Sequence, residues 1–219
     1  AASDVYKRQV KNFGSQLAPF YTILPLFVGS LLMAVTLKPG VSRKNREGLD
    51  NPKPHQLFLG HYGVFGVIAL LQSTFSLGGN LLFLHVQAVH PWLFMLAGWT
   101  SSLVFSFFTY TMVASFGNIG KAIGVLVLVA QISGSNGAYP LAVLPKIISD
   151  ISPFLPATHS IVALRAAIAC IYNNDYWHAL GSLLLFLIPL LLIGLVLRIP
   201  LVKFNKWYVA KVESTKVIS

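Results

Sequence analysis

Five apolar segments, joined by short loops, limit what this sequence can fold into more than any other feature. They cover about residues 17–37, 57–77, 92–115, 119–135 and 179–199, and the segment at 119–135 is the shortest. A helix needs about 20 apolar residues to cross the hydrocarbon of a bilayer. Only 10% of the 219 residues are charged, against about 25% in soluble domains. The sequence therefore predicts an all-α, polytopic membrane helix bundle with about five transmembrane helices.

The chain is interrupted between its fourth and fifth apolar segments. The apolar run that follows Lys121 ends near Ile132 and gives way to small and polar residues. The pieces 140–150 and 153–169 are each helix-like with a proline near the start, but neither is long enough to span a bilayer. We therefore expect a broken helical segment, re-entrant or external, over residues 136–177. It contains four prolines: Pro140, Pro145, Pro153 and Pro156.

Basic residues predict the orientation of the bundle. The loop 38–56 holds five Lys or Arg against two acids, the turn 116–121 holds Lys121, and the chain after residue 197 holds five more Lys or Arg. Because such residues mark the cytoplasmic side, we expect these three regions in the cytoplasm. The last includes a basic tail, 207–219, after a membrane domain over 10–206. The net charge of +10 then reflects topology, so the expected partner is the lipid bilayer and no nucleic acid.

The first nine residues do not fit the membrane pattern. Residues 1–9 lack the apolar core of a signal peptide, and we interpret them as a non-native scar or a truncated end. The predicted topology also places the N-terminus outside the cell. For that reason we expect an upstream span and an external region in the native protein.

Motifs for catalysis, cofactor binding or metal binding are missing from the sequence. Gly117-x-x-Gly120-Lys121 is not a phosphate loop, because that motif needs four residues between its glycines and a Ser or Thr after its Lys, whereas Ala122 follows here. Cys170 is the only cysteine, and no Ser/His/Asp arrangement has the pattern of a triad. We therefore predict no enzyme, no cofactor and no metal site.

Five polar residues are the candidates for a functional role. Asn118 and Lys121 shape the turn at 116–121, where a cytoplasmic ATPase could dock. Gln131, Asn136 and Arg165 are the polar groups nearest the broken segment. Structural hydrogen bonding or membrane topology is the competing interpretation for each of the five.

Helix packing gives three further expectations. The Ser- and Thr-rich segment 92–115 should pack inside the bundle. Gln72, a lone polar residue in the second apolar segment, should form an interhelical hydrogen bond. Gly60, Gly63 and Gly66 lie three residues apart, so this face of the second helix should approach a neighbour closely.

A set of motifs in the second half of the chain resembles those of a known family. The motifs are Phe116-Gly117-Asn118-x-Gly120-Lys121, Gln131-Ile132-x-Gly134-x-x-Gly137, Tyr139-Pro140, Leu144-Pro145, and Pro153-Phe154-Leu155-Pro156 followed by Arg165. This pattern is similar to the C-terminal membrane region of the YhgE/Pip (phage infection protein) family, which is related to type-2 ABC transporter permeases. The resemblance covers residues 10–206.

The resemblance implies a type-2 ABC permease-like fold in the plasma membrane of a Gram-positive bacterium. It implies an N-terminal span and a long extracellular region before these five helices. A permease fold also implies export driven by a separate ATPase, and we expect the chain to pair into a homo-oligomer (dimer).

Two functions stay open at this point. The first is an exporter permease with its ATPase in trans, because the five apolar segments contain no Asp or Glu and ion-coupled transport usually needs an intramembrane carboxylate. The alternative is a membrane anchor or scaffold for an extracellular domain that acts as a phage receptor or secretion-system component. The resemblance supports this alternative, since family members are tied to phage adsorption and a relative serves in type VII secretion.

Overall fold

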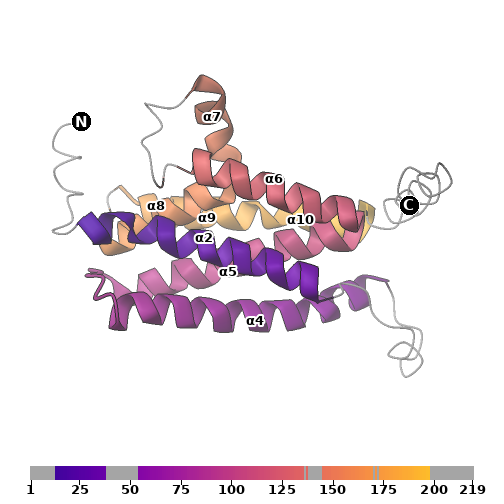
Figure 1. Cartoon of the computed structure of the whole chain (residues 1–219), viewed down its shortest axis with the longest axis horizontal. Helices are drawn as coiled ribbons and strands as arrows, with labels where there is room; N and C mark the ends of the chain where they lie inside the picture. Colours follow the sequence, from indigo (N-terminus) through magenta and orange to yellow (C-terminus); the bar gives the residue numbers. More distant parts are fainter. Residues whose placement is uncertain are drawn as a thin grey trace, which may run out of the picture.

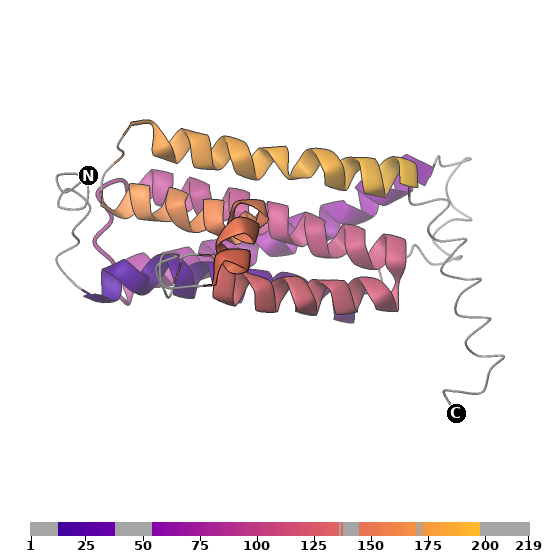
Figure 2. The same ribbon diagram turned by 90° about the horizontal axis from the view of Figure 1, so that it is seen from above.

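The computed structural model describes residues 13–37, 54–135, 137, 145–169, 171 and 173–197, and its regular elements in these ranges are helices (Figure 1). This confirms the predicted all-α bundle. The long helices run side by side, which is also visible from above (Figure 2). In chain order the elements are α2 (Phe13–Thr36), α4 (Pro54–Leu82), α5 (Pro91–Phe116), α6 (Asn118–Gly134), α7 (Lys146–Ile151), η2 (Ser152–Phe154), α8 (Pro156–Ile168), α9 (Asp175–Leu185), α10 (Leu187–Leu192) and η3 (Ile193–Leu197).

Four of these helical stretches are long and apolar enough to cross a membrane. They are Leu17–Thr36, His55–Leu82, Pro91–Phe116 and Asp175–Val196. A fifth span results if Lys146–Phe154 and Pro156–Ile168, which meet at a bend of 77°, are counted as one broken span. The four to five candidates agree with the predicted number of about five.

The predicted segment at 119–135 is a shorter helix than a full span. α6 has 17 residues, so it rises about 26 Å, less than the roughly 30 Å of bilayer hydrocarbon. α4 extends five residues beyond the predicted end at 77, to Leu82, because no proline interrupts the chain there. The last span likewise begins earlier than predicted, at Asp175.

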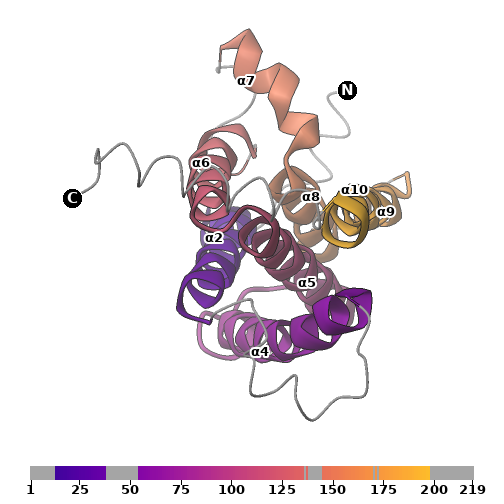
Figure 3. The same cartoon turned by 90° about the vertical axis from the view of Figure 1, so that its right-hand side faces the viewer.

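Helix α5 lies at the centre of the bundle. It contacts α2, α4, α6, α8, α9, α10 and η3, and the end-on view shows the other helices arranged around it (Figure 3). Its buried hydroxyl groups donate hydrogen bonds to the backbones of neighbouring helices. Ser102 Oγ donates to Ala69 O at 2.8 Å, Thr109 Oγ1 to Ser30 O at 3.1 Å. The prediction that the Ser- and Thr-rich segment packs inside is confirmed.

Tyrosines add three more bonds between α5 and its neighbours. Tyr110 Oη donates to Phe58 O at 2.8 Å, and Tyr62 Oη donates to Leu103 O at 3.0 Å. Tyr176, fully buried on α9, donates to Leu93 O at 2.8 Å. Since lipid offers no hydrogen-bond partners, these bonds satisfy polar groups of the bundle interior and hold the helices in register. The hydroxyls of Thr111 and Ser115, also on α5, are buried without a hydrogen-bond partner within the described residues.

Gln72 forms the interhelical hydrogen bond that the sequence predicted. Its Nε2 donates to Pro25 O on α2 at 3.1 Å. Gly29, one turn further along α2, leaves the space for the Gln72 amide, because a Cβ at Gly29 would meet that amide directly. The same pair of helices is joined by Asn80 Nδ2, which donates to Thr22 Oγ1 at 2.7 Å.

The expectation that the glycines of the second helix approach a neighbour was wrong for Gly60 and Gly63. Both are exposed, and a Cβ at either position would meet nothing within 4 Å. Close helix approach occurs elsewhere, as at Gly120, where a Cβ would run into the backbone of Met112. Spacing along a helix identifies a common face, but it does not tell whether that face meets protein or lipid.

The broken segment is confirmed, although only part of it lies outside the bundle. α7 projects sideways part-way along the bundle (Figures 1 and 3). α8 instead packs within it against α2, α5 and α9, with Ala163, Leu164 and Ala167 fully buried. The sequence predicted a re-entrant or external segment; α7 is the part that lies outside the bundle, and α8 is the part that packs inside it.

The close contact between α5 and α6 yields a stability prediction. Gly120→Ala places a methyl group against the Met112 carbonyl, so we expect a loss of about 1–3 kcal/mol from overpacking. Gly60→Ala is the matched control, because it gains the same helix propensity of about 1 kcal/mol with no steric contact. In thermal unfolding measured in detergent, Gly120→Ala should have a lower Tm than the wild type, whereas Gly60→Ala should not. Equal Tm values for the two variants would contradict the close packing at Gly120.

Candidate functional site

Four of the five candidate residues can be placed, in two regions at opposite ends of α6. Asn118 and Lys121 lie in its first turn, directly after Gly117. Gly117 has φ 59° and ψ −125°, a backbone conformation that favours glycine, and its N–H donates to Val113 O at 2.9 Å. This glycine reverses the chain between α5 and α6. Asn118 is exposed there and Lys121 is half-buried.

The turn shares its end of the bundle with other helix ends. The end of α2, the start of α4 and the end of η3 all lie at the same end of the bundle as the α5–α6 turn (Figure 1). In the sequence, the basic loop lies between α2 and α4 and the basic tail follows η3. The helix ends next to these basic regions are therefore on one side of the bundle, which agrees with the predicted topology.

Gln131 lies near the other end of α6, and Arg165 of α8 bonds to the chain that follows this end, at the break. Gln131 lies about 20 Å from Asn118 along the helix axis. It is 2% exposed, and Ser135, one turn later, is 1% exposed. Arg165 Nη2 on α8 donates to the carbonyl of Gly137 at 3.0 Å. Asn136 lies outside the described residues.

The break is tightly enclosed by side chains of three helices. A Cβ at Gly134 would lie 2.7 Å from Leu155 Cδ1 and 3.5 Å from Ile148 Cγ2 of α7. A Cβ at Gly137 would collide with Phe20 of α2 and would lie 3.0 Å from Ile161 of α8. Glycine at both positions therefore lets the end of α6 approach α2, α7 and α8.

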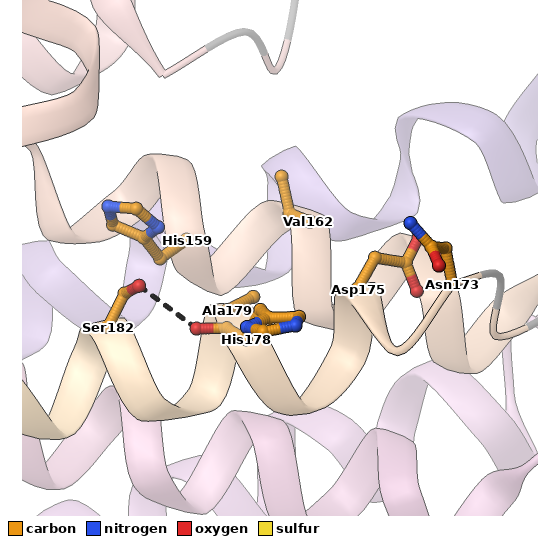
Figure 4. Close-up of a pocket in the computed structure, with 7 residues that line it drawn as sticks. All are labelled: His159, Val162, Asn173, Asp175, His178, Ala179 and Ser182. Atoms are coloured by element: carbon orange, nitrogen blue, oxygen red, sulfur yellow. Dashed lines mark hydrogen bonds between the residues drawn. The ribbon is translucent and has the colours of Figure 1, made fainter.

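A hollow between α8 and α9 was not predicted from the sequence (Figure 4). Its volume is ≈ 470 Å³. His159 Nε2 makes a 2.9 Å hydrogen bond with Pro153 O, and Ser182 Oγ donates to His178 O at 2.9 Å. The lining residues are His159, Val162, Asn173, Asp175, His178, Ala179 and Ser182.

The lining surface of this hollow is mostly apolar, with a few polar groups from residues such as His159, Asp175 and His178. Within the described residues no three His, Cys, Asp or Glu side chains converge closely enough to hold a metal ion. The sequence contained no signal for the hollow, because His159 and His178 belong to different helices. They line the same hollow only because α8 packs on α9.

Comparison with known proteins covers the whole helix bundle. The family model described as ABC-2 family transporter protein matches residues 2–197. The chain belongs to the ABC-2 transporter family. It is a multi-pass membrane protein of the permease type, as the resemblance implied.

One relative of this ABC-2 family chain is the uncharacterized protein YhgE of Bacillus subtilis (strain 168). The two are 29% identical over 179 residues, which is 80% of this chain and 22% of that protein. The chain thus spans less than a quarter of the length of the curated relative that it matches. No solved structure matches the chain.

The orientation of the bundle predicts that residues at its two ends are labelled from opposite sides of the membrane. In a Cys170→Ser background, a membrane-impermeant maleimide added to intact cells should modify Asn173→Cys but not Asn118→Cys. Inside-out vesicles should give the reverse. Both positions are exposed. Labelling after detergent solubilisation is the control that both introduced thiols can react with the maleimide. Labelling of both positions from one side would contradict the bundle orientation.

Proposed function

We propose that this chain is the permease part of an ABC-2 exporter driven by a separate cytoplasmic ATPase. The observation that carries the proposal is the family match over residues 2–197, which includes every described helix. Asp and Glu are absent from α2, α4, α5, α6 and α8, while Asp150 is exposed on α7 and Asp175 stands at the start of α9. An ion-coupled carrier usually needs a carboxylate that faces the interior of the helix bundle, and the packed helices offer none, so ATP is the better energy source.

The α5–α6 turn is the proposed contact with the ATPase. It presents exposed Asn118 and the Lys121 ammonium at the end of the bundle that carries the basic connections. A rigid glycine turn between two packed helices can transmit a movement of the ATPase to both helices, because Gly120 lies directly on the Met112 backbone. The proposed location is the plasma membrane of a Gram-positive bacterium, with residues 10–206 as membrane domain and 207–219 as cytoplasmic tail.

Charge reversal at this turn tests the coupling. Lys121→Glu should reduce ATP turnover by the partner ATPase in reconstituted vesicles about tenfold, since reversing one interfacial charge typically costs more than 1.4 kcal/mol. His90→Glu, at an exposed position of the opposite end, is the control and should leave turnover unchanged. Failure to find any ATPase that co-purifies and responds to this protein would contradict the proposed function.

We also propose that two copies pair through α7. α6 is too short to reach across the bilayer, so α7 leaves the bundle at a depth where lipid would surround it. Lys146 and Asp150 of α7 are exposed, as are the apolar side chains of Ile147 on α7 and Phe154 on η2. Charges at this depth usually face protein or water. In a two-fold pair, Lys146 can face Asp150 of the partner subunit.

Cysteine cross-linking in native membranes tests the pairing. In the Cys170→Ser background, Ile147→Cys should give a covalent dimer, whereas Leu126→Cys on the outward face of α6 should not, although both side chains are similarly exposed, at 68% and 69%. Lys146→Asp should weaken the dimer through like-charge repulsion, and adding Asp150→Lys should restore it. Equal cross-linking at 147 and 126 would contradict a specific contact.

A second function is favoured by the length of the relative. Because the chain spans 22% of the Bacillus subtilis protein, the bundle can instead serve as an anchor or scaffold for an extracellular domain that acts as a phage receptor or secretion component. Deleting the external region of a full-length relative while keeping these helices distinguishes the two. Loss of the phenotype supports the anchor, and its survival supports the permease.

A further inference from the structure

The hollow between α8 and α9 lies along the first two turns of the last span. Asp175, His178 and Ser182 line it from α9, where their spacing of three and four residues places them on one face. His159 and Val162 line it from α8. Asp175 and Ser182 are about 10 Å apart along the helix axis. Because α9 begins at the end of the bundle opposite the α5–α6 turn (Figure 1), the hollow extends from that end toward the middle.

The polar groups at the inner end of the hollow are bonded within the chain. His159 Nε2 makes its hydrogen bond with Pro153 O, and Ser182 Oγ donates to His178 O, as Figure 4 shows for the second bond. A polar group at this depth needs a partner in the protein, because lipid offers none. These two bonds therefore supply partners to the inner polar groups without a ligand.

The polar side chains at the mouth of the hollow are available to a ligand. Asn173 belongs to the turn between α8 and α9, where its φ is 48°, and His178 lies near the start of α9. Both side chains are exposed, and within the described residues neither the amide nor the imidazole forms a hydrogen bond. The groups that can bind a ligand are therefore those nearest the end of the bundle.

The walls and the inner end of the hollow are apolar. Val162 and Ala179 contribute to its lining, and at the inner end the Phe186 ring lies 5.8 Å from the His159 ring. Leu185, which follows on the same helix, is exposed on the surface of the span. The surface thus changes from hydrogen-bonding groups at the end of the bundle to apolar groups further in. A lipid has the same order, because its headgroup lies at the membrane boundary and its acyl chains lie in the hydrocarbon.

The polar lining suits a headgroup that both donates and accepts hydrogen bonds. The amide of Asn173 and the neutral imidazole of His178 each offer a donor and an acceptor, as a sugar hydroxyl does. Among the described residues that line the hollow there is no Lys or Arg, so a phosphate headgroup would find no cation to pair with. The chemistry therefore favours an uncharged, hydroxyl-rich headgroup over an anionic one.

We infer that this hollow binds a lipid with an uncharged, hydroxyl-rich headgroup of the sugar type. Asn173 and His178 bind the hydroxyl groups, and an acyl chain follows the apolar part of the hollow past Val162 toward Leu185. The volume of ≈ 470 Å³ is within the range of about 300–1,000 Å³ for small-molecule sites. The inference goes beyond the proposed permease function and does not depend on it, because the site lies at the end opposite the proposed ATPase contact.

Lipid retention by the purified full chain tests the site. Native mass spectrometry, in a detergent without a sugar headgroup, would compare diglucosyl diacylglycerol with phosphatidylglycerol of the same acyl chains. The wild type should bind the glycolipid about tenfold more tightly, since the lining pairs with hydroxyl groups and offers no cation to the phosphate. Equal retention of the two lipids would overturn the inference, because it indicates ordinary lipid contact around the bundle.

Replacing the polar groups at the mouth tests which residues bind the headgroup. His178→Leu with Asn173→Gly, where glycine keeps the positive φ, should weaken glycolipid binding roughly tenfold and leave phosphatidylglycerol unchanged, because hydrogen bonds to the sugar are lost. His90→Leu is the matched control, since His90 is exposed at the same end of the bundle and does not line the hollow. The control should bind like the wild type. Wild-type binding by the double variant would show that the site is wrong.

A second variant tests the apolar part of the hollow while the polar groups stay in place. Val162→Phe adds a ring to the half-buried wall and should weaken glycolipid binding without lowering the Tm of the lipid-free protein. The free disaccharide, at the same concentration as the lipid, should not displace it, because the sugar lacks the acyl chain. Unchanged binding by Val162→Phe, or displacement by the free sugar, would contradict a lipid ligand.

Discussion

The hydrogen bonds from polar side chains to helix backbones are the interactions on which this bundle depends. A bilayer supplies no hydrogen-bond partners, so each interior polar group must find one inside the protein. α5 meets much of this need by pairing Ser102, Thr109 and Tyr110 with carbonyls of α4 and α2, although its Thr111 and Ser115 hydroxyls are buried without a partner within the described residues. Because these bonds need specific distances, they fix the positions of the surrounding helices as well as their contacts with α5.

The same requirement applies at the break between α6 and α8. A helix that stops inside a membrane exposes backbone carbonyls, and protein or water must cover them. Arg165 covers one of them, the carbonyl of Gly137, and Phe20 and Ile161 enclose it. Gln131 and Ser135 are left with donors to spare.

The sequence predicted the features that depend on local composition. Apolar length and charge identified the membrane bundle, and a lone polar residue in an apolar helix correctly indicated the bond of Gln72. Features that depend on which helix face meets protein were not predictable. Gly60 and Gly63 have the spacing of a packing face yet point outward. The pairing of Arg165 with Gly137, and the meeting of His159 and His178 around one hollow, arise from tertiary packing alone.

The position of the break relative to the bilayer is the central claim, and electron cryo-microscopy of the protein in lipid nanodiscs measures it directly. We predict that the lipid density encloses the end of α6 at Gly134, and that α8 completes the crossing beside α5. The α5–α6 turn at Gly117 should emerge on one side. A map in which the break lies outside the lipid density, or in which α6 continues as one unbroken spanning helix, would contradict this account.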